Sequence, residues 1–287
     1  MKKFRCLLAV LLILSLLTAC GSSQSSEQSD GDTMILATTY PMYYLTQRIT
    51  DGVEGVTVEL MVSEAVSCLH DYTLTTGQMK MIEQADFIVM NGAGLEEFMA
   101  SALKSVPEDK VVESAEGVSL IDGDPHIWLD PECFAQQGEN VAGALAERYP
   151  DHAETFSENV SALTAELTDL KTELCSSVAD LTCRELITFH DGFSYFAQGL
   201  DLTIAAAIEE EEGAETSAAE LKEICDLIGE KNIPAIFVER NGSTNAAEII
   251  SRETGVQVYT LNTMMDGQTD YFTAMRDNVA AVKEALS

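Results

Sequence analysis

The sequence predicts an α/β protein made of two βα lobes with parallel sheets, joined by one long linking helix. Short β-branched runs alternate with helix-length segments in both halves of the chain, which is typical of βαβ units on parallel sheets. Between the halves lies a helix-forming segment, residues 151–178, that contains neither Gly nor Pro. We therefore expect an N-terminal lobe over residues 33–148, the linking helix within 149–180, and a C-terminal lobe over 181–287.

In the first half, β-branched runs and apolar-periodic runs follow each other in regular alternation. The expected strands cover residues 34–40, 56–62 and 87–91, with weaker candidates at 111–112 and 118–121. The expected helices cover residues 42–50 and 75–84, a stretch after Gly94, and a stretch from Pro131 to about Arg148. Proline suits the first turn of a helix because its missing N–H has no intrahelical partner there.

The long segment carries a single apolar stripe. Its large apolar residues recur at spacings of four and three: Phe156, Val160, Leu163, Leu167, Leu170, Leu174 and Val178. This pattern predicts one continuous helix about 42 Å long, at 1.5 Å per residue. A coiled-coil dimer is the alternative. Because the charges that flank the stripe are not clearly complementary, a strut packed along both lobes of a monomer is favoured.

The alternation restarts in the second half. The expected strands cover residues 185–189, 202–208, 233–238 and 256–261, and the expected helices run from a capping box at Ser217 to Gly229, over 243–254, and from about Thr269 onward. Two such lobes predict a cleft between them. Ligands of open α/β sheets bind beyond the carboxyl ends of the strands, so we expect the functional site there.

The first 32 residues have the pattern of an export signal followed by a tether. Three basic residues precede the apolar stretch 6–17, which is too short to span a bilayer as a mature helix, so residues 1–19 read as a signal peptide. Leu17-Thr18-Ala19-Cys20 resembles a bacterial lipobox, in which Cys20 is lipidated; an ordinary cleaved signal that ends in cysteine is the alternative. Residues 20–32 are serine-rich and predict a flexible tether. We expect an extracytoplasmic protein, lipid-anchored to the bacterial cell membrane.

The charge balance restricts the classes of partner. The chain has 16 basic and 48 acidic residues, a formal charge of −32. Such a surface repels nucleic acid and offers no polybasic patch to anionic lipid.

Five cysteines follow the tether, at positions 68, 133, 175, 183 and 225. Their pairing cannot be read from the sequence. Cys175 and Cys183 are the easiest pair to join, against the alternative of two free thiols. The absence of any Cys-x-x-Cys excludes a zinc ribbon or a thioredoxin-type motif.

Three of the four histidines stand where a β-like run meets a loop: His70, His126 and His190. Imidazole is the commonest protein ligand for transition metals, and three imidazoles fill most of a tetrahedral zinc shell. Because 56 and 64 residues separate them, only the tertiary fold can bring them together. We therefore predict a metal site in the interlobe cleft, with His152, near the start of the linking helix, as a structural or surface residue.

The motifs around these histidines resemble those of the zinc/manganese class of solute-binding lipoproteins that serve ABC importers. The matching segments are Ala37-Thr38-Thr39-Tyr40-Pro41, His70-Asp71-Tyr72, residues 85–96, 126–131, 189–191, 193–196 and 231–239. The resemblance implies that His70 and His126 are metal ligands from the N-lobe and His190 one from the C-lobe. It also implies a rigid linking helix, and an ABC permease with its ATPase as partners.

The fourth ligand departs from the family pattern. Where the family often has a carboxylate, this chain has Asn262, a neutral and weaker donor. Water or Asn262 would then complete the site, and the thiolate of Cys68 is a rival ligand. Around the ligands we expect supporting carboxylates at Asp130, Asp191 and Glu239, with Asp130 accepting the second imidazole proton of a histidine.

The ligand set favours Zn²⁺ over Mn²⁺, because manganese prefers oxygen-rich shells. Binding needs neutral imidazoles, so affinity should fall as the pH drops through about 6. The alternatives are a manganese- or iron-selective receptor of the same class, a zinc-dependent hydrolase, and a surface adhesin. Neither His-Glu-x-x-His nor a comparable signature occurs, so we expect a receptor that is not an enzyme.

Overall fold

The computed structural model describes residues 33–63, 69, 72–209, 216–240, 242 and 244–287, and Thr33–Ser287 form one compact unit. The predicted signal peptide, Cys20, the tether, Cys68 and His70 all lie outside the described residues. None of the helices within the described ranges has both the length and the apolar character needed to cross a membrane.

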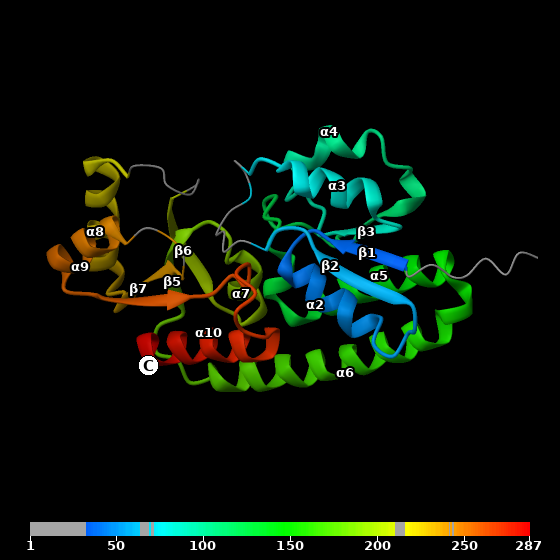
Figure 1. Cartoon of the computed structure of the whole chain (residues 1–287). Coiled ribbons are helices and arrows are strands. Elements are labelled where there is room, and N and C mark those ends of the chain that lie inside the picture. Colours follow the sequence, from blue (N-terminus) through cyan, green and yellow to red (C-terminus); the bar gives the residue numbers. More distant parts are fainter. Residues whose placement is uncertain (1–32, 64–68, 70–71, 210–215, 241, 243) are drawn as a thin grey trace, which may run out of the picture. The chain divides into compact units, whose positions relative to one another are not determined.

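The N-terminal lobe is built on a four-stranded parallel sheet of order β2-β1-β3-β4 (Figure 1). Its strands are β1 (Thr33–Ala37), β2 (Val56–Leu60), β3 (Phe87–Met90) and β4 (Val111–Glu113). Its helices are α2 (Tyr40–Ile49), α3 (Thr76–Gln84), α4 (Ala100–Leu103) and α5 (Pro131–Arg148), with short 3₁₀ turns η1 (Glu97–Met99), η2 (Glu108–Lys110) and η3 (Ile127–Leu129). The central strand β3 is apolar and buried at every position, as expected for a parallel strand covered on both faces.

One predicted strand is wrong. Residues 118–121 form no strand, because they follow a turn in which Gly117 has φ +74° and the Val118 amide bonds to the Ala115 carbonyl at 3.0 Å. Beyond that turn, the Ile121 amide donates to the Tyr195 hydroxyl at 3.2 Å. The segment is therefore held by a side chain of the other lobe instead of by a neighbouring strand.

The linking helix α6 (Ala153–Ser177) follows a short 3₁₀ turn, η4 (Pro150–His152). The predicted stripe is confirmed, since Phe156, Val160, Leu163, Leu167, Leu170 and Leu174 are its buried residues. α6 contacts α2 and α5 of the N-terminal lobe and α10 (Tyr271–Leu286) of the C-terminal lobe (Figure 1). The apolar stripe is thus buried within this chain, as the strut interpretation requires.

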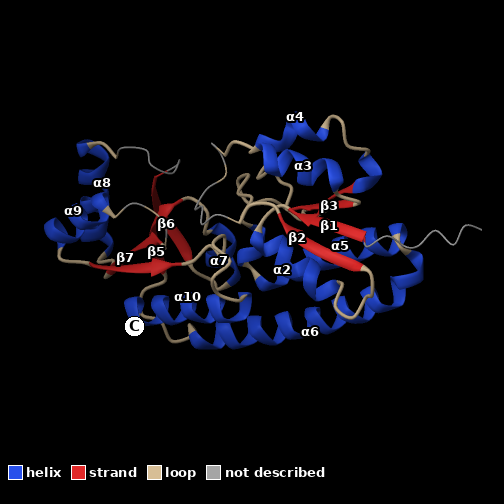
Figure 2. Ribbon diagram, in the orientation of Figure 1, coloured by secondary structure: helices blue, strands red, loops and turns tan. Residues whose placement is uncertain are grey.

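The C-terminal lobe repeats the plan with a parallel sheet of order β6-β5-β7-β8 (Figure 2). Its strands are β5 (Glu185–His190), β6 (Thr203–Glu209), β7 (Ala235–Glu239) and β8 (Gln257–Leu261). Besides α10, its helices are α7 (Ser194–Gly199), α8 (Ala218–Lys231) and α9 (Asn245–Thr254). The predicted capping box is confirmed: the Ser217 hydroxyl accepts from the Glu220 amide and the Glu220 carboxylate accepts from the Ser217 amide.

Strand β7 has a different apolar cluster on each face. Ala235 and Phe237 belong to the main core, whereas Ile236 and Val238 belong to a smaller cluster with residues of α8 and α9. Alternate residues of a strand point to opposite faces, so this short apolar strand serves both cores. The predicted fold class, two βα lobes with parallel sheets and a long linking helix, is confirmed.

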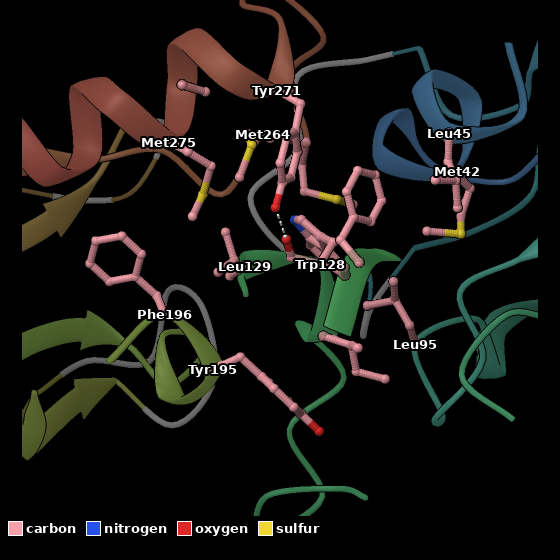
Figure 3. Packing of buried hydrophobic residues seen from close by; sticks show 14 of the residues in the cluster. Met42, Leu45, Leu95, Trp128, Leu129, Tyr195, Phe196, Met264, Tyr271 and Met275 are labelled. Carbon is pink, nitrogen blue, oxygen red and sulfur yellow. Dashed lines mark hydrogen bonds between the residues drawn. The ribbon is translucent and has the colours of Figure 1, made fainter. Parts of the chain in front are cut away.

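The main core continues from one lobe into the other through Trp128 and Tyr271 (Figure 3). The Trp128 indole N–H donates to the Thr263 carbonyl at 2.8 Å, and the Tyr271 hydroxyl donates to the Trp128 carbonyl at 2.8 Å. Tyr271 also stacks on Phe134, with ring centroids 4.4 Å apart. These contacts fix the loop after His126 against the C-terminal lobe.

Cys175 and Cys183, the pair that the sequence offers most readily for a bridge, are both free thiols in the structure. The Cys175 thiol donates to the Gly199 carbonyl, and the Cys183 thiol to the Glu185 carbonyl. Of the two alternatives, the structure has the free thiols.

Candidate metal site

Two of the predicted ligands meet between the lobes. His126 immediately precedes η3 in the N-terminal lobe, and His190 is the last residue of β5 in the C-terminal lobe. Their Nε2 atoms are 3.1 Å apart, and the two residues are only 3% and 6% exposed. The carboxyl end of a parallel strand therefore brings one imidazole to the other, as the cleft prediction requires.

This separation fits a shared metal ion. Two nitrogen ligands about 2.0–2.1 Å from a tetrahedral zinc lie roughly 3.3 Å apart, close to the observed distance of 3.1 Å between the two Nε2 atoms. The rings are nearly perpendicular, with an interplanar angle of 84°. The two Nε2 atoms converge without the rings stacking, which places both nitrogens within reach of a single ion.

Asp124 orients His126. Its Oδ1 lies 2.7 Å from the His126 Nδ1 and accepts the His126 backbone amide at 2.8 Å. Its Oδ2 accepts the backbone amide of Ser194, in the other lobe, at 3.3 Å. With the Nδ1 proton directed at a carboxylate, the Nε2 atom keeps its lone pair for a metal.

The ionised form of Asp124 is favoured despite its burial. Burial alone raises the pKa of this carboxyl, but the hydrogen bonds and electrostatic interaction with His126, together with the bond from Ser194, outweigh it and hold the pKa below its usual value. An anionic carboxylate behind the imidazole raises the basicity of that ligand.

Gly192 closes one side of the site. A Cβ at this position would lie 2.7 Å from the His190 Nε2 and 2.8 Å from the His126 Cε1. Its φ lies outside the left-handed region, so glycine is needed here for close packing and not for backbone conformation. Only a residue without a side chain leaves both imidazoles in place.

Comparison with known proteins identifies the family. Residues 35–285 match the family model described as ZnuA, zinc-uptake complex component A, periplasmic. The chain belongs to this family. The resemblance that its motifs predicted is therefore confirmed over nearly the whole of the described chain.

Individual ZnuA-family relatives agree with this assignment. The high-affinity zinc uptake system protein ZnuA of Bacillus subtilis (strain 168) is 28% identical over 318 residues, covering 99% of this chain and 98% of that protein. The zinc-binding lipoprotein AdcA of Streptococcus pneumoniae (strain ATCC BAA-255 / R6) is 27% identical over 312 residues, and the match spans 99% of this chain but 61% of AdcA. The crystal structure of the Zn(II)-bound ZnuA-like domain of S. pneumoniae AdcA superposes with a TM-score of 0.77 at 27% identity, covering 89% of this chain and 99% of that one.

The other predicted ligands are placed as follows. His70 and Cys68 lie outside the described residues. Asn262 is buried, and its Oδ1 accepts the Met264 backbone amide at 2.8 Å. Within the described ranges, no group of three or more His, Cys, Asp or Glu side chains gathers as a metal site. The two imidazoles are thus the part of the predicted ligand set that the structure brings together.

Two of the predicted supporting carboxylates, Asp130 and Glu239, make hydrogen bonds to other residues. Asp130 caps α5 by accepting the Glu132 amide at 2.9 Å, and it accepts from the Lys171 ammonium at 2.6 Å. Glu239, at the end of β7, accepts from the Thr263 hydroxyl at 2.6 Å. Asp191 is exposed between β5 and α7. The carboxylate bonded to the candidate ligand His126 is that of Asp124; Asp130 bonds to Glu132 and Lys171.

Asp124 and Gly192 were not among the residues predicted for the site. For Asp124 a local signal existed, because a carboxylate two residues before a histidine can accept both its backbone amide and its Nδ1 proton. For Gly192 the only signal was its position two residues after His190. Its contact with His126 spans the two lobes, so no local pattern predicts it.

Proposed function

We propose that this protein is an extracytoplasmic receptor, anchored by a lipid on Cys20, that captures Zn²⁺ between its lobes and delivers it to an ABC importer. The proposal rests on the convergence of the His126 and His190 Nε2 atoms, 3.1 Å apart in a buried site. Membership of the zinc-uptake family and the Zn(II)-bound structure of a relative support zinc as the cargo.

In this proposal, His126 and His190 bind the ion directly and His70 supplies a third imidazole. Asp124 keeps the Nδ1 proton of His126 directed away from the ion. Water or Asn262 fills the fourth position. A site with an exchangeable fourth ligand holds zinc without enclosing it completely, which suits a protein that must release its cargo to a permease.

The receptor performs no reaction on the ion. A hydrolase would need a positioned general base and a substrate pocket beside the metal. The carboxylate bonded to His126, that of Asp124, also accepts a hydrogen bond from Ser194. Binding and release are therefore the function that this arrangement of side chains supports.

The test is the metal content of protein purified without added metal. The parent should retain roughly one zinc per chain, and His126→Ala and His190→Ala should each lose most of it, because two remaining imidazoles hold zinc weakly. His152→Ala is the matched control, since His152 lies at the start of α6 and contacts Phe156. Full zinc occupancy in the His126→Ala variant would overturn the proposal.

Import is tested in cells that lack the protein. Growth under zinc chelation should be restored by the parent and not by His126→Ala. Zinc-dependent hydrolysis by the purified protein, without any growth defect, would favour the enzyme instead.

A further inference from the structure

Behind the loop that bears His126 lies a buried hydrogen-bonded cluster that the ligand set does not include. Its members are Thr38, Asn91, Glu96, Ser114 and Gln137, which are at most 3% exposed. Thr38, Asn91 and Ser114 directly follow β1, β3 and β4. The cluster therefore lies at the carboxyl edge of the sheet, where α/β proteins place their ligands.

Asn91 is the centre of this cluster, and each of its polar atoms has a partner. Its backbone amide donates to the Glu96 Oε1 at 2.8 Å, and its carbonyl accepts from the Ser114 hydroxyl at 3.1 Å. Its Oδ1 accepts from the Gln137 amide at 2.8 Å. Its Nδ2 donates to the carbonyls of Gly92, at 3.0 Å, and Pro125, at 2.9 Å.

The bond to Pro125 connects the cluster to the metal site. Pro125 is buried and lies between Asp124 and His126. A buried carbonyl requires a donor, since leaving it unpaired costs free energy. Asn91 supplies that donor from the sheet, across 34 residues of sequence. Within this loop, Asp124 bonds to His126. From the core, Asn91 bonds to the Pro125 carbonyl.

We propose that Asn91 is a positioning residue for zinc binding: its amide fixes the Pro125 carbonyl, and through it the imidazole of His126. Glu96, Ser114 and Gln137 hold Asn91 itself in one orientation. Burying an amide costs free energy unless its polar atoms are hydrogen-bonded. With all its polar atoms bonded, the Asn91 amide is held in one orientation. The loop that bears His126 is thereby fixed relative to the sheet. This inference rests on the proposed function, because it assigns a purpose to the placement of His126.

The test compares Asn91→Ala with Asn140→Ala. Asn140, on α5, also donates its side-chain amide to two backbone carbonyls, those of Ser114 at 2.7 Å and Glu116 at 2.8 Å. Asn140 does not bond to the loop that bears His126. The Asn140→Ala variant therefore measures the effect of losing such an amide on zinc affinity and exchange when the bond to Pro125 is kept. Gln137→Met serves as a second variant that loosens Asn91 while leaving its bond to Pro125, in case Asn91→Ala fails to fold.

Two quantities are measured in the full-length protein. Zinc affinity, from competition with a chelator, should fall by roughly tenfold or more in Asn91→Ala, by less in Gln137→Met, and by less than about twofold in Asn140→Ala. In the metal-free protein, hydrogen exchange of the His126 amide should become about tenfold faster in Asn91→Ala than in Asn140→Ala.

Equal zinc affinity and equal His126 exchange in the Asn91 and Asn140 variants would overturn the inference and leave Asn91 a purely structural residue. If the parent binds no zinc, the proposed function fails. The exchange measurement then still decides whether Asn91 positions the loop.

Discussion

At the scale of single residues, the site depends on a position that carries no side chain. Gly192 lies against the imidazoles of both candidate ligands, His126 and His190, and its φ would admit alanine. A methyl group there would have to displace ring atoms 2.6–2.8 Å away. The two candidate ligand histidines would keep their side chains. The substitution therefore tests the spacing of the imidazoles without changing the ligand atoms.

We expect Gly192→Ala to lower zinc affinity by roughly 10- to 100-fold, the range that loss of support around metal ligands costs. Chelator competition measures this effect. Gly143→Ala is the matched control, because a Cβ at Gly143, within α5, meets nothing within 4 Å. Unchanged zinc affinity in Gly192→Ala would show that the two rings can separate and still bind the ion.

A second residue-scale effect concerns the buried carboxyl of Glu96. Burial raises its pKa to about 7, even though bonds from Thr38, Asn91 and Gly92 favour the ionised form. Its pKa in the unfolded chain is about 4.3. The folded state thus binds the proton more tightly, so this group contributes stability below about pH 4 that is lost as the pH rises through 7.

Glu96→Gln removes this titration. The stability of the parent relative to Glu96→Gln should therefore fall by roughly 3 kcal/mol between about pH 4 and pH 8. Denaturant unfolding at several pH values measures the difference. The exposed neighbour Glu97 supplies the control Glu97→Gln. Parallel stability curves for the parent and Glu96→Gln would contradict the assignment.

At the scale of elements, α6 contributes stability through its buried stripe. Leu167 is 0% exposed near the middle of this helix, whereas the adjacent Thr168 is exposed. α6 contacts helices of both lobes, so a cavity beneath it would weaken the element that joins them.

Leu167→Ala should destabilise the protein by about 2–5 kcal/mol, because it removes a buried side chain and leaves a cavity. Thr168→Ala, one position along, should change stability by less than about 1 kcal/mol. The free energy of unfolding in denaturant measures both. A similar loss in the two variants would mean that the stripe is not the packed face.

At this scale most predictions from the sequence are correct, but one expected strand does not form and helix α7 was not expected. The stripe of α6, the capping box of α8 and the start of α5 at Pro131 were predicted correctly, since each depends on residues near one another in the chain. The strand expected at residues 118–121 does not form. Its β-branched residues indicated a strand, but a hydroxyl from α7 takes the backbone bond of Ile121 instead.

At the scale of the whole molecule, the two lobes share a core. Buried residues of both sheets and of α6 belong to one cluster. Trp128 makes a hydrogen bond to the β8–α10 loop and another to Tyr271 of α10 (Figure 3). His126 and His190, the two described residues of the candidate metal site, therefore belong to one continuous packed structure. The small cluster between the β5–β7 sheet and helices α8 and α9 is the exception.

The sequence by itself determined the class of fold, the linking helix, the family and the candidate ligands His126 and His190, because hydrophobic period, capping residues and local motifs are properties of short segments. Only the tertiary structure decided that the Nε2 atoms of these two ligands meet, that Asp124 rather than Asp130 orients His126, and that Gly192 and Asn91 adjoin the site. Those are contacts between residues far apart in the chain or choices between equivalent carboxylates. They depend on how sheets and loops pack, which no local pattern encodes.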